Sequence, residues 1–491
     1  MSKEFYGIDL GTTYSCIATI DSDDLVQVIP NKKGSMVTPS AVYFDDENKM
    51  QVGQAAKAHL GDRPENTVVF IKREMSNKDY VVTINGKTYD PVEISSFILK
   101  HLVDFANEKR KNEEGKAPLY DVVITVPAYF GNLECTRTKE AGIKAGLNVM
   151  QLIAEPTAAA ISYGRKMQGD KNLLVYDLGG GTFDVSIMEF KSGIVDTKST
   201  RGDHHLGGVD WDTALAKLAL SKINVSFDTL KDIEKNKILL EAEKCKQLLT
   251  DEDSAVMQFN YKGIQTIEVT RQEFESATHS LMTRTSLLVQ EALDAANMTK
   301  DDIDEVILVG GSSRMLMVPR MVQDMIGITP KLADPDMAVA KGAALMASQT
   351  DKGYVDGGVT FGKDKGSRAY GMNVISDEVG RELCFNLIKR NDDKVIEREF
   401  DFFTNSNNQK CVVLHFYENE SNEEWKEIDP TEEIEGKTGS IEWGYPVPKG
   451  TPVKVIVKRD NSGCVRIFAE CCGAKGEFEI VTSIDSNIIK K

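Results

Sequence analysis

The sequence is poor in cysteine, in long apolar runs and in positive charge. Eight cysteines in 491 residues, without paired metal-ligand spacing, indicate reduced thiols rather than a disulfide framework, and the adjacent Cys471 and Cys472 do not form a CxxC motif. No apolar run approaches the roughly 18 residues that a membrane-spanning helix needs. Lys and Arg number 59 against 76 Asp and Glu, which gives a net charge of −17. This balance argues against nucleic acid and anionic membranes as partners, because both bind clustered Lys and Arg.

The start of the chain gives an expectation about location. Residues 1–4 lead directly into a short apolar run, without the apolar core of a signal peptide. Together with the reduced thiols and the lack of a membrane span, this predicts a cytoplasmic protein.

The composition, 41% apolar and 27% charged, is that of a soluble globular protein with several domains. From residue 1 to about 350, strand-like runs alternate with amphipathic helical runs, which predicts an α/β architecture with helices over residues 92–106 and 233–249 among others. Residues 351–367 are rich in glycine and charge and predict a linker. Residues 368–485 show short alternating strands and no helical segment. A Walker A outline inside the linker is rejected, because Asp364 stands where a P-loop needs Ser or Thr.

Two segments are built to one plan, DLGTT at residues 9–13 and DLGGGT at residues 177–182. Each lies between two short apolar runs, which predicts a hairpin with its turn at the glycines. Glycine permits φ > 0 and close backbone approach, so backbone N–H groups and threonine hydroxyls can contact phosphate oxygens. Asp9 and Asp177 would then hold the hydration shell of a Mg²⁺ ion. Two ordinary tight turns are the alternative for either segment alone, and the matched pair argues against it.

A third glycine turn, VGGSSR at residues 309–314, completes a set of long motifs. The phrases GIDLGTTYSC, VPAYF, AEPTAAAISYG, YDLGGGTFDVSI, VGGSSR and DPDMAVAKGAA follow one another in the chain. In this combination and order the chain closely resembles the Hsp70 family of chaperones over residues 1–350. The resemblance implies an actin-like, two-lobed ATPase domain, followed by a β-sandwich domain that binds apolar peptide segments of unfolded proteins. It also implies hydrolysis of ATP to ADP and phosphate.

The resemblance assigns roles to individual residues. Asp9, Asp177 and Asp184 are the expected metal residues, the last for K⁺. Lys72 and Glu155 would place the attacking water, and Asp177 and Thr182 complete the expected catalytic group. Without the resemblance, Lys72 would be taken for a solvated surface lysine. The expected contacts to ATP or ADP are Gly11, Thr12, Thr13, Tyr14, Gly179, Gly180, Gly181, Gly207, Gly208, Glu243, Lys246, Thr250, Gly310, Gly311, Ser313, Arg314 and Asp336.

The resemblance is weaker after the linker. Matching by position places five apolar residues on the peptide groove, namely Met372, Ile375, Phe402, Val412 and Leu414. The alternative is that these residues are plain sandwich core, because inward-facing apolar side chains form the core of any β-sandwich.

Several departures from the family pattern concern communication between the domains. The family linker carries consecutive leucines, whereas this chain has GGVTF at residues 357–361. Cys135 and Gln151 replace two arginines of the interdomain switch and of the J-domain contact. A helical lid and an acidic tail are not expected. A J-domain co-chaperone and a nucleotide exchange factor are therefore possible partners, with coupling between the domains in question.

Two other functions compete with an ATP-hydrolysing chaperone. One is a regulatory or exchange-factor-like relative that binds ATP with little turnover, although Lys72, Glu155 and Thr182 argue against it. The other is an actin-like filament protein or a sugar kinase, which would share the fold but not the attached β domain.

Overall fold

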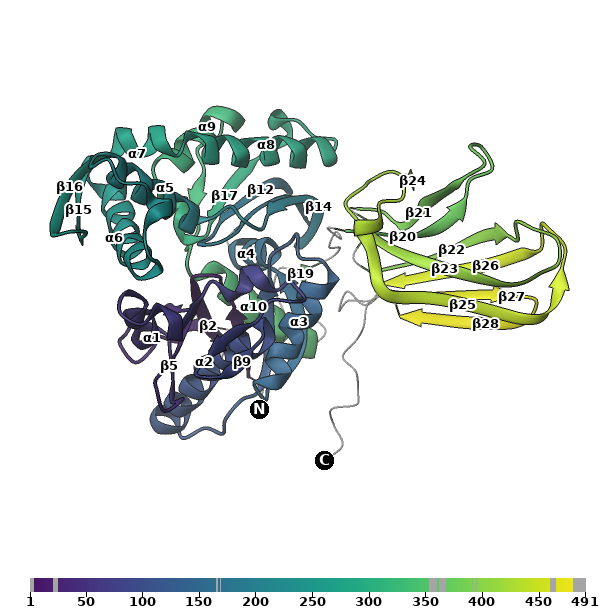
Figure 1. Ribbon diagram of the computed structural model, residues 1–491, viewed down its shortest axis with the longest axis horizontal. Coiled ribbons are helices and arrows are strands. Elements are labelled where there is room, and N and C mark those ends of the chain that lie inside the picture. The colour runs from purple at the N-terminus through teal and green to yellow at the C-terminus, as the bar shows by residue number, and fades with distance from the viewer. Residues whose placement is uncertain are drawn as a thin grey trace. The chain divides into compact units, whose positions relative to one another are not determined.

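The computed structural model describes residues 4–20, 25–164, 167, 169–352, 360–361, 368–390, 392–393, 395–459 and 465–479. The chain divides into two compact units (Figure 1). The first unit comprises residues 1–128 and 137–362, and the second comprises residues 129–136 and 363–491. Within the described residues, no helix combines the length and apolarity needed to cross a membrane.

The first predicted hairpin forms the centre of a six-stranded sheet. Its strands β1 and β2 are antiparallel, β10 is parallel to β1, and β11 is parallel to β10. The sheet order is β11 (Asn148–Ala154), β10 (Asp121–Val126), β1 (Phe5–Asp9), β2 (Tyr14–Ile20) and β3 (Val26–Val28), with β4 (Thr38–Pro39) also paired to β2.

The second predicted hairpin forms the centre of another six-stranded sheet with the same plan. Strand β13 is antiparallel to β12, and β14 is antiparallel to β13. On the other side of β12, β17 is parallel to β12, and β18 is parallel to β17. The duplication seen in two short motifs therefore extends over both sheets. The order is β18 (Lys331–Leu332), β17 (Glu305–Val309), β12 (Lys171–Leu178), β13 (Phe183–Lys191), β14 (Ile194–Asp203) and β19 (Thr360–Phe361).

Two helices fill the space between these sheets. Helix α10 (Ala338–Lys352) packs on β1, β2 and β10, and helix α4 (Glu155–Gly164) packs on β12 and against α10. The contact between the helices is close, because a Cβ added at Gly342 would lie 2.8 Å from Ala158 Cα. Their alanines share one apolar core with both sheets. Because α4 begins at Glu155, this packing fixes that carboxylate at the end of β11.

The helices predicted from periodicity are present and longer than expected. The helix predicted over residues 92–106 is α2 (Pro91–Glu114), which starts at a capping box between Asp90 and Glu93 and ends at Gly115 in the left-handed region. The helix predicted over residues 233–249 is α6 (Asp232–Asp251). The other helices are α1 (Gln54–Ala58), α3 (Asn132–Lys144), α5 (Gly208–Ser221), α7 (Arg271–Ala277), α8 (His279–Ala295) and α9 (Met317–Ile326).

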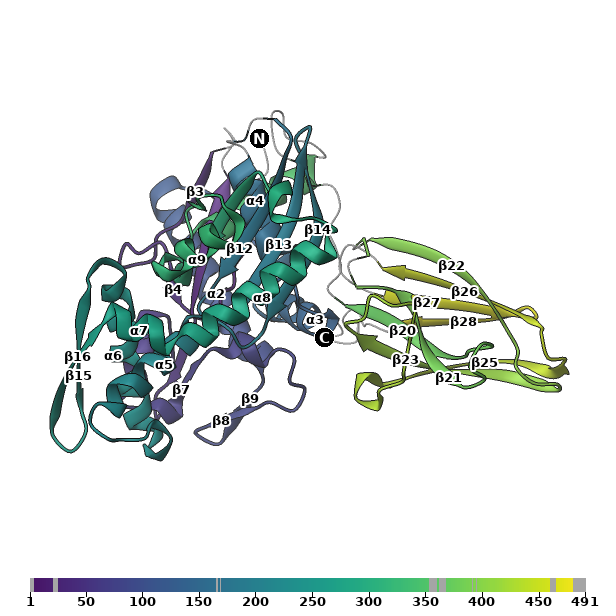
Figure 2. The same cartoon turned by 90° about the horizontal axis from the view of Figure 1, so that it is seen from above.

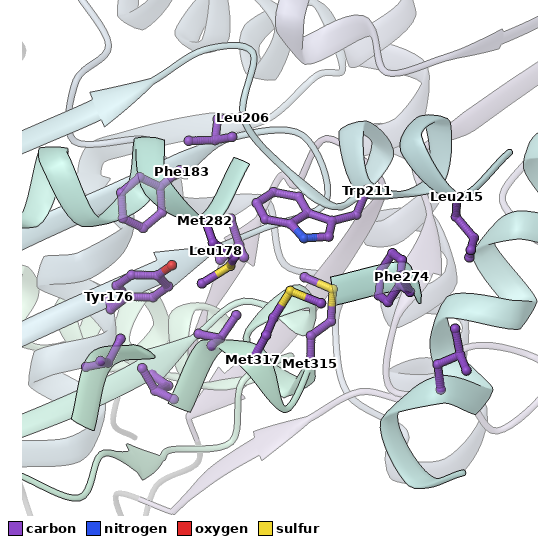
Figure 3. Packing of buried hydrophobic residues seen from close by; sticks show 14 of the residues in the cluster. Tyr176, Leu178, Phe183, Leu206, Trp211, Leu215, Phe274, Met282, Met315 and Met317 are labelled. Carbon is purple, nitrogen blue, oxygen red and sulfur yellow. The ribbon is translucent and has the colours of Figure 1, made fainter. Parts of the chain in front are cut away.

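A large core lies on the other face of the second sheet. Helix α8 runs across β13 and β14 (Figure 2), and α5 and α6 pack against each other within the same core. Trp211 of α5 is fully buried there, next to methionines that fill the space around its ring (Figure 3). Smaller sheets complete the unit: β5 (Ala41–Phe44) with β6 (Met50–Val52) and β7 (Thr67–Val69), β8 (Val82–Ile84) with β9 (Lys87–Tyr89), and β15 (Ser254–Asn260) with β16 (Ile264–Thr270).

The second unit consists of two antiparallel sheets around one shared core. Strand β26 shows why the prediction of alternation holds, since Val453, Val455 and Val457 are buried and their neighbours are not. One sheet has the order β24 (Trp425–Lys426), β21 (Glu382–Ile388), β20 (Ala369–Ile375), β23 (Gln409–Asn419) and β25 (Glu433–Val447). The other has the order β22 (Ile396–Phe403), β26 (Pro452–Arg459), β27 (Val465–Cys471) and β28 (Ala474–Glu479).

The predicted linker is described at four residues, of which 351 and 352 end α10. Thr360 and Phe361 form β19, which pairs in parallel with Ile194 and Val195 of β14. The remainder of the linker from residue 353 onward, including most of the rejected Walker A outline, lies outside the described residues.

Candidate functional site

The turns of the two hairpins face each other. A Cβ added at Gly181 would lie 2.6 Å from Thr12 Cβ, and one added at Gly180 would lie 2.5 Å from Thr13 Cβ. Both distances are too short for any side chain at the glycines, so close approach explains their presence. The expected use of φ > 0 is wrong here, because Gly11 and the three glycines of the second turn do not adopt the left-handed region. In the third glycine turn, Gly310 does adopt it, with φ of 79°.

A cavity of about 740 Å³ opens between these turns. It receives residues from both sheets and from the 3₁₀ turns η3 (Ile71–Glu74) and η6 (Gly311–Arg314). Most of the residues expected to bind nucleotide or metal line it, although they come from separate parts of the chain. They are Asp9, Gly11, Thr12, Thr13, Tyr14, Lys72, Glu155, Asp177, Gly179, Gly180, Thr182, Gly208, Glu243, Lys246, Thr250, Gly310, Gly311, Arg314 and Asp336.

Four expected residues lie just behind the cavity wall. Gly181 and Gly207 pack backbone against backbone, since a Cβ at Gly207 would lie 2.6 Å from Gly181 Cα. The Ser313 hydroxyl donates to the Val309 carbonyl at 2.5 Å, so it holds the third turn on β17. Asp184 is buried and stands opposite Asp177 in the β12–β13 register.

Carboxylates gather at the floor of the cavity. Glu155 and Asp177 are 7% and 6% exposed, and Lys72, which is 4% exposed, donates to Glu155. Burial, together with the nearby Glu155 carboxylate, raises the pKa of Asp9 to about 7. The same causes raise the pKa of Asp177 well above its ordinary range. The Lys72 ammonium group therefore interacts with three carboxyl groups, those of Asp9, Glu155 and Asp177. When all three are ionised, the net charge of this group of residues is negative.

These groups fit a phosphate ligand and a hard cation. The buried hydroxyl oxygens of Thr12 and Thr13 have no hydrogen-bond partner among the described residues. Buried polar atoms are nearly always paired, so these two indicate a polar ligand between the turns. Carboxylate oxygens are the protein ligands that Mg²⁺ prefers. Among the described residues no group of three or more His, Cys, Asp or Glu side chains could hold a metal alone, so phosphate and water would supply the other ligands.

Helix α6 closes the other end of the cavity. Lys246 donates to the Gly208 carbonyl at 2.9 Å and pairs with Asp212 at 2.8 Å. Glu243 accepts from Lys57 at 2.6 Å and from Tyr14 at 3.0 Å, which joins α1 and β2 to α6. Burial opposes ionisation of Glu243, but Lys57 lowers its pKa below the ordinary value. Glu243 and Lys246 are thus held by residues outside this helix rather than solvated.

Sequence reasoning missed the residues that position this site. Arg73 donates to the Gly181 carbonyl at 2.8 Å and pairs with Asp210 at 2.6 Å, which holds the second turn in place. Thr125 donates to Asp9 at 3.2 Å from the neighbouring strand. Lys57 and Asp212 are the partners of the expected α6 residues. Arg73 is adjacent to Lys72, and Thr125 directly precedes the VPAYF motif, so these two lay beside recognised positions.

The five expected peptide-groove residues differ in exposure. Met372 and Leu414 are 2% and 3% exposed and belong to the core shared by the two sheets. Phe402 and Val412 are half-buried beside that core, and Ile375 is 44% exposed at the end of β20. Met372 and Leu414 therefore face inward in this conformation, and the assignment of the five residues to a peptide groove stays a prediction.

The chain is similar to known proteins over nearly its whole length. The profile of the family described as Hsp70 protein matches residues 5–488. The chain is 37% identical to the chaperone protein DnaK of Thermotoga petrophila over 98% of its own length and 80% of that protein. It is 37% identical to DnaK of Thermosipho africanus and 36% identical to DnaK of Thermosipho melanesiensis over similar shares. With the duplicated turns, the charged cleft and this similarity in view, the chain belongs to the Hsp70 family of ATP-hydrolysing chaperones.

Proposed function

We propose that this chaperone binds ATP and Mg²⁺ in the 740 Å³ cavity of the first unit and extended apolar segments of unfolded proteins in the second unit. Residues 1–350 would form an actin-like ATPase domain of two lobes, one for each six-stranded sheet. Residues 351–367 would link it to a β-sandwich peptide-binding domain at 368–485. The duplicated sheet topology and the core shared by two antiparallel sheets support this division.

The phosphates would lie between the hairpin turns. Thr12 and Thr13 offer hydroxyls without partners in the described part of the chain, and Thr182 adds a third hydroxyl from the second turn. Asp9 and Asp177 would hold Mg²⁺ through its water shell, and Asp184 would contribute to a K⁺ site. The cation supplies neutralisation of phosphate charge.

Hydrolysis requires an aligned water and stabilised charge more than covalent chemistry. Lys72 lies at the cavity floor with its ammonium on Glu155, and both side chains are buried. The pair would orient the attacking water toward the terminal phosphate. Glu155 fixes the ammonium, so the lysine would not need to reorganise during the reaction.

The adenosine would occupy the end of the cavity closed by α6. Glu243, Lys246 and Thr250 face it from that helix. Arg314 and Asp336 pair at 2.6 Å on the opposite wall. A J-domain co-chaperone and a nucleotide exchange factor are the partners that we infer, and the cytoplasm is the expected compartment.

The observation that carries the proposal is a set of buried, incompletely neutralised carboxyl groups beside two threonine hydroxyls that have no partner among the residues described. The test is ATP binding by calorimetry with and without Mg²⁺, on wild type and Asp177→Asn. Wild type should bind ATP more tightly with Mg²⁺, and the variant should lose most of that difference. Asp228→Asn, at an exposed position in the same unit, is the control and should behave as wild type.

Equal Mg²⁺ dependence in wild type and Asp177→Asn would refute the metal assignment. The comparisons do not support a relative that binds ATP with little turnover. A steady-state hydrolysis assay on the same samples tests that alternative directly.

A further inference from the structure

Two adjacent cysteines lie at a tight turn in the second unit. Strands β27 and β28 pair up to Cys471 and Ala474, so that Cys472 and Gly473 alone connect them (Figure 1). Both connecting residues have positive φ, 52° for Cys472 and 83° for Gly473. This is the backbone of a type I′ hairpin turn, where Asn, Asp or Gly is usual at the first position. Cysteine has none of the local hydrogen-bonding advantages of Asn at this position.

The turn brings the two sulfur atoms together. In an extended strand, consecutive side chains point to opposite faces of the sheet. The left-handed conformation of Cys472 reverses this, and the Cys471 Sγ and Cys472 Sγ atoms lie 3.7 Å apart. Cys471 is 1% exposed and rests on the sandwich core, whereas Cys472 is exposed. The result is a dithiol with one sulfur anchored and the other open to solvent.

The surroundings narrow the chemistry of this pair. Among the described residues no third His, Cys, Asp or Glu completes a metal-binding group, so a tetrahedral zinc site is not present there. Burial raises the pKa of Cys471 to about 11, which keeps this thiol protonated near neutral pH. Peroxide oxidises thiolates, so this cysteine is poorly suited to a peroxide sensor. A ligand that takes two sulfur atoms and accepts protonated thiols fits better.

We propose that Cys471 and Cys472 form a chelating site for trivalent arsenicals, a class of soft, thiophilic electrophiles. In the reaction, an arsenoso group R–As=O condenses with both thiols. Two S–H bonds and the As=O bond break, two As–S bonds form, and the two protons leave with the oxygen as water. Arsenic stays trivalent and no oxidant is needed. Cysteine sulfur is a soft ligand of the type that such centres prefer.

Chelation is what separates this pair from the other cysteines. After the first As–S bond forms, the second sulfur is already held nearby, so the second bond is intramolecular. Among the cysteines that the structure describes, Cys16, Cys245 and Cys384 are buried, and Cys135 and Cys411 are half-buried in separate elements. A single thiol gives one As–S bond, which excess monothiol can exchange. The dithiol adduct should resist a monothiol and yield only to a competing dithiol.

The test uses the full chain and phenylarsine oxide. The protein is incubated with the arsenical and excess glutathione, and intact-mass spectrometry counts the adducts before and after addition of dimercaptopropanol. Wild type should retain one arsenical in glutathione and lose it to the dithiol. Cys472→Ser, at an exposed position that leaves the core unchanged, should lower the apparent affinity by about 10² to 10⁴-fold.

Two controls decide the outcome. Cys411→Ser removes a thiol from the same unit without touching the pair and should bind as wild type. Cys471→Ser should lose the adduct in the same way as Cys472→Ser, and circular dichroism checks that the variant is folded. Absence of a glutathione-resistant adduct on wild type, or its persistence at full level in Cys472→Ser, would overturn the proposal.

Discussion

The two units use their buried polar groups in different ways. In the first unit, Lys72, Glu155 and Asp177 are all less than a tenth exposed and surround one cavity. In the second unit, Asn386 and Asn419 are buried as deeply, but their amides bond each other and the Glu423 carbonyl. Buried charge is costly unless it is paired, so the first unit is prepared for a charged ligand. The second unit uses its polar groups to fix its own loop.

This difference has a consequence for the second unit. A peptide groove formed by its inward-facing residues would have to open at the expense of the core that those residues now fill. Leu414 and Val413 are neighbours on β23, yet Leu414 is 3% exposed and Val413 is 51% exposed. Substitutions at these two positions compare a buried side chain with an exposed one on the same strand.

The largest expected effect is on stability of the second unit. Leu414→Ala should reduce its free energy of unfolding by about 2 to 5 kcal/mol, because it leaves a cavity in the core. Val413→Ala should change that free energy by no more than about 0.5 kcal/mol. Hydrogen exchange of the β23 and β25 amides in the full chain measures both. A Leu414→Ala variant as stable as Val413→Ala would mean that this side chain already reaches an open groove.

The second expected effect concerns catalysis in the first unit. Lys72→Ala should lower single-turnover hydrolysis of ATP by about 10² to 10³-fold, as loss of one preorganised donor to a developing charge does. ATP affinity should change little, because the contact matters mainly in the transition state. Lys87→Ala, at an exposed lysine on β9, is the control for removal of positive charge.

Removal of Lys72 also leaves Glu155 without its partner, which could destabilise the fold. The double variant Lys72→Met with Glu155→Gln leaves no unpaired charge and should show the same catalytic loss. Wild-type hydrolysis in either variant would remove Lys72 from the catalytic assignment.

The same contrast explains what the sequence could predict. Glycine turns, their threonines and their aspartates are local motifs, so both central hairpins and their turn residues in the cleft were predictable, whereas Lys72 needed the family resemblance. Lys57 and Arg73 were not predictable, because Lys57 meets Glu243 across 186 residues and Arg73 meets Asp210 across 137. Only the packed fold brings such pairs together.

In the second unit, alternation predicted strands such as β26 and β27 but not the function of their inward residues. Met372 and Leu414 have the same pattern whether they line a groove or fill a core. The expected φ > 0 of the hairpin glycines failed for a related reason. A glycine in the sequence indicates that the position does not tolerate a side chain. It does not tell whether the reason is a positive φ or a close neighbour.

The third prediction concerns pH and the buried charge of the first unit. Burial raises the pKa of Asp212 to about 6 from an ordinary value near 3.8, although Lys246 partly opposes this. Because the pKa of Asp212 is higher in the folded state than in the unfolded state, its contribution to the free energy of unfolding is fully present below about pH 4. That stability is lost as pH rises through about 6, by roughly 2 to 3 kcal/mol.

Asp212→Asn has no carboxyl group to titrate at this position. Its free energy of unfolding should therefore rise relative to that of wild type between pH 4 and 6. Urea unfolding of both proteins at a series of pH values gives the difference. Asp228→Asn, at an exposed site, should run parallel to wild type. A constant difference between Asp212→Asn and wild type across this range would show that Asp212 is ionised throughout.

The smallest expected effect tests whether the two units communicate through the linker. The missing leucines suggested weak coupling, yet Thr360 and Phe361 pair with β14 through the backbone. Such pairing does not depend on leucine side chains.

Thr360→Pro removes one backbone donor, and a hydrogen bond contributes about 0.5 to 1.5 kcal/mol net. The pairing equilibrium should therefore shift by about twofold to tenfold. If the pairing couples the units, stimulation of ATP hydrolysis by a leucine-rich peptide should fall to a similar extent. Thr360→Val keeps the donor and should leave the stimulation unchanged. Equal stimulation in wild type and Thr360→Pro would place the coupling elsewhere, whereas a loss in Thr360→Val would assign it to the side chain.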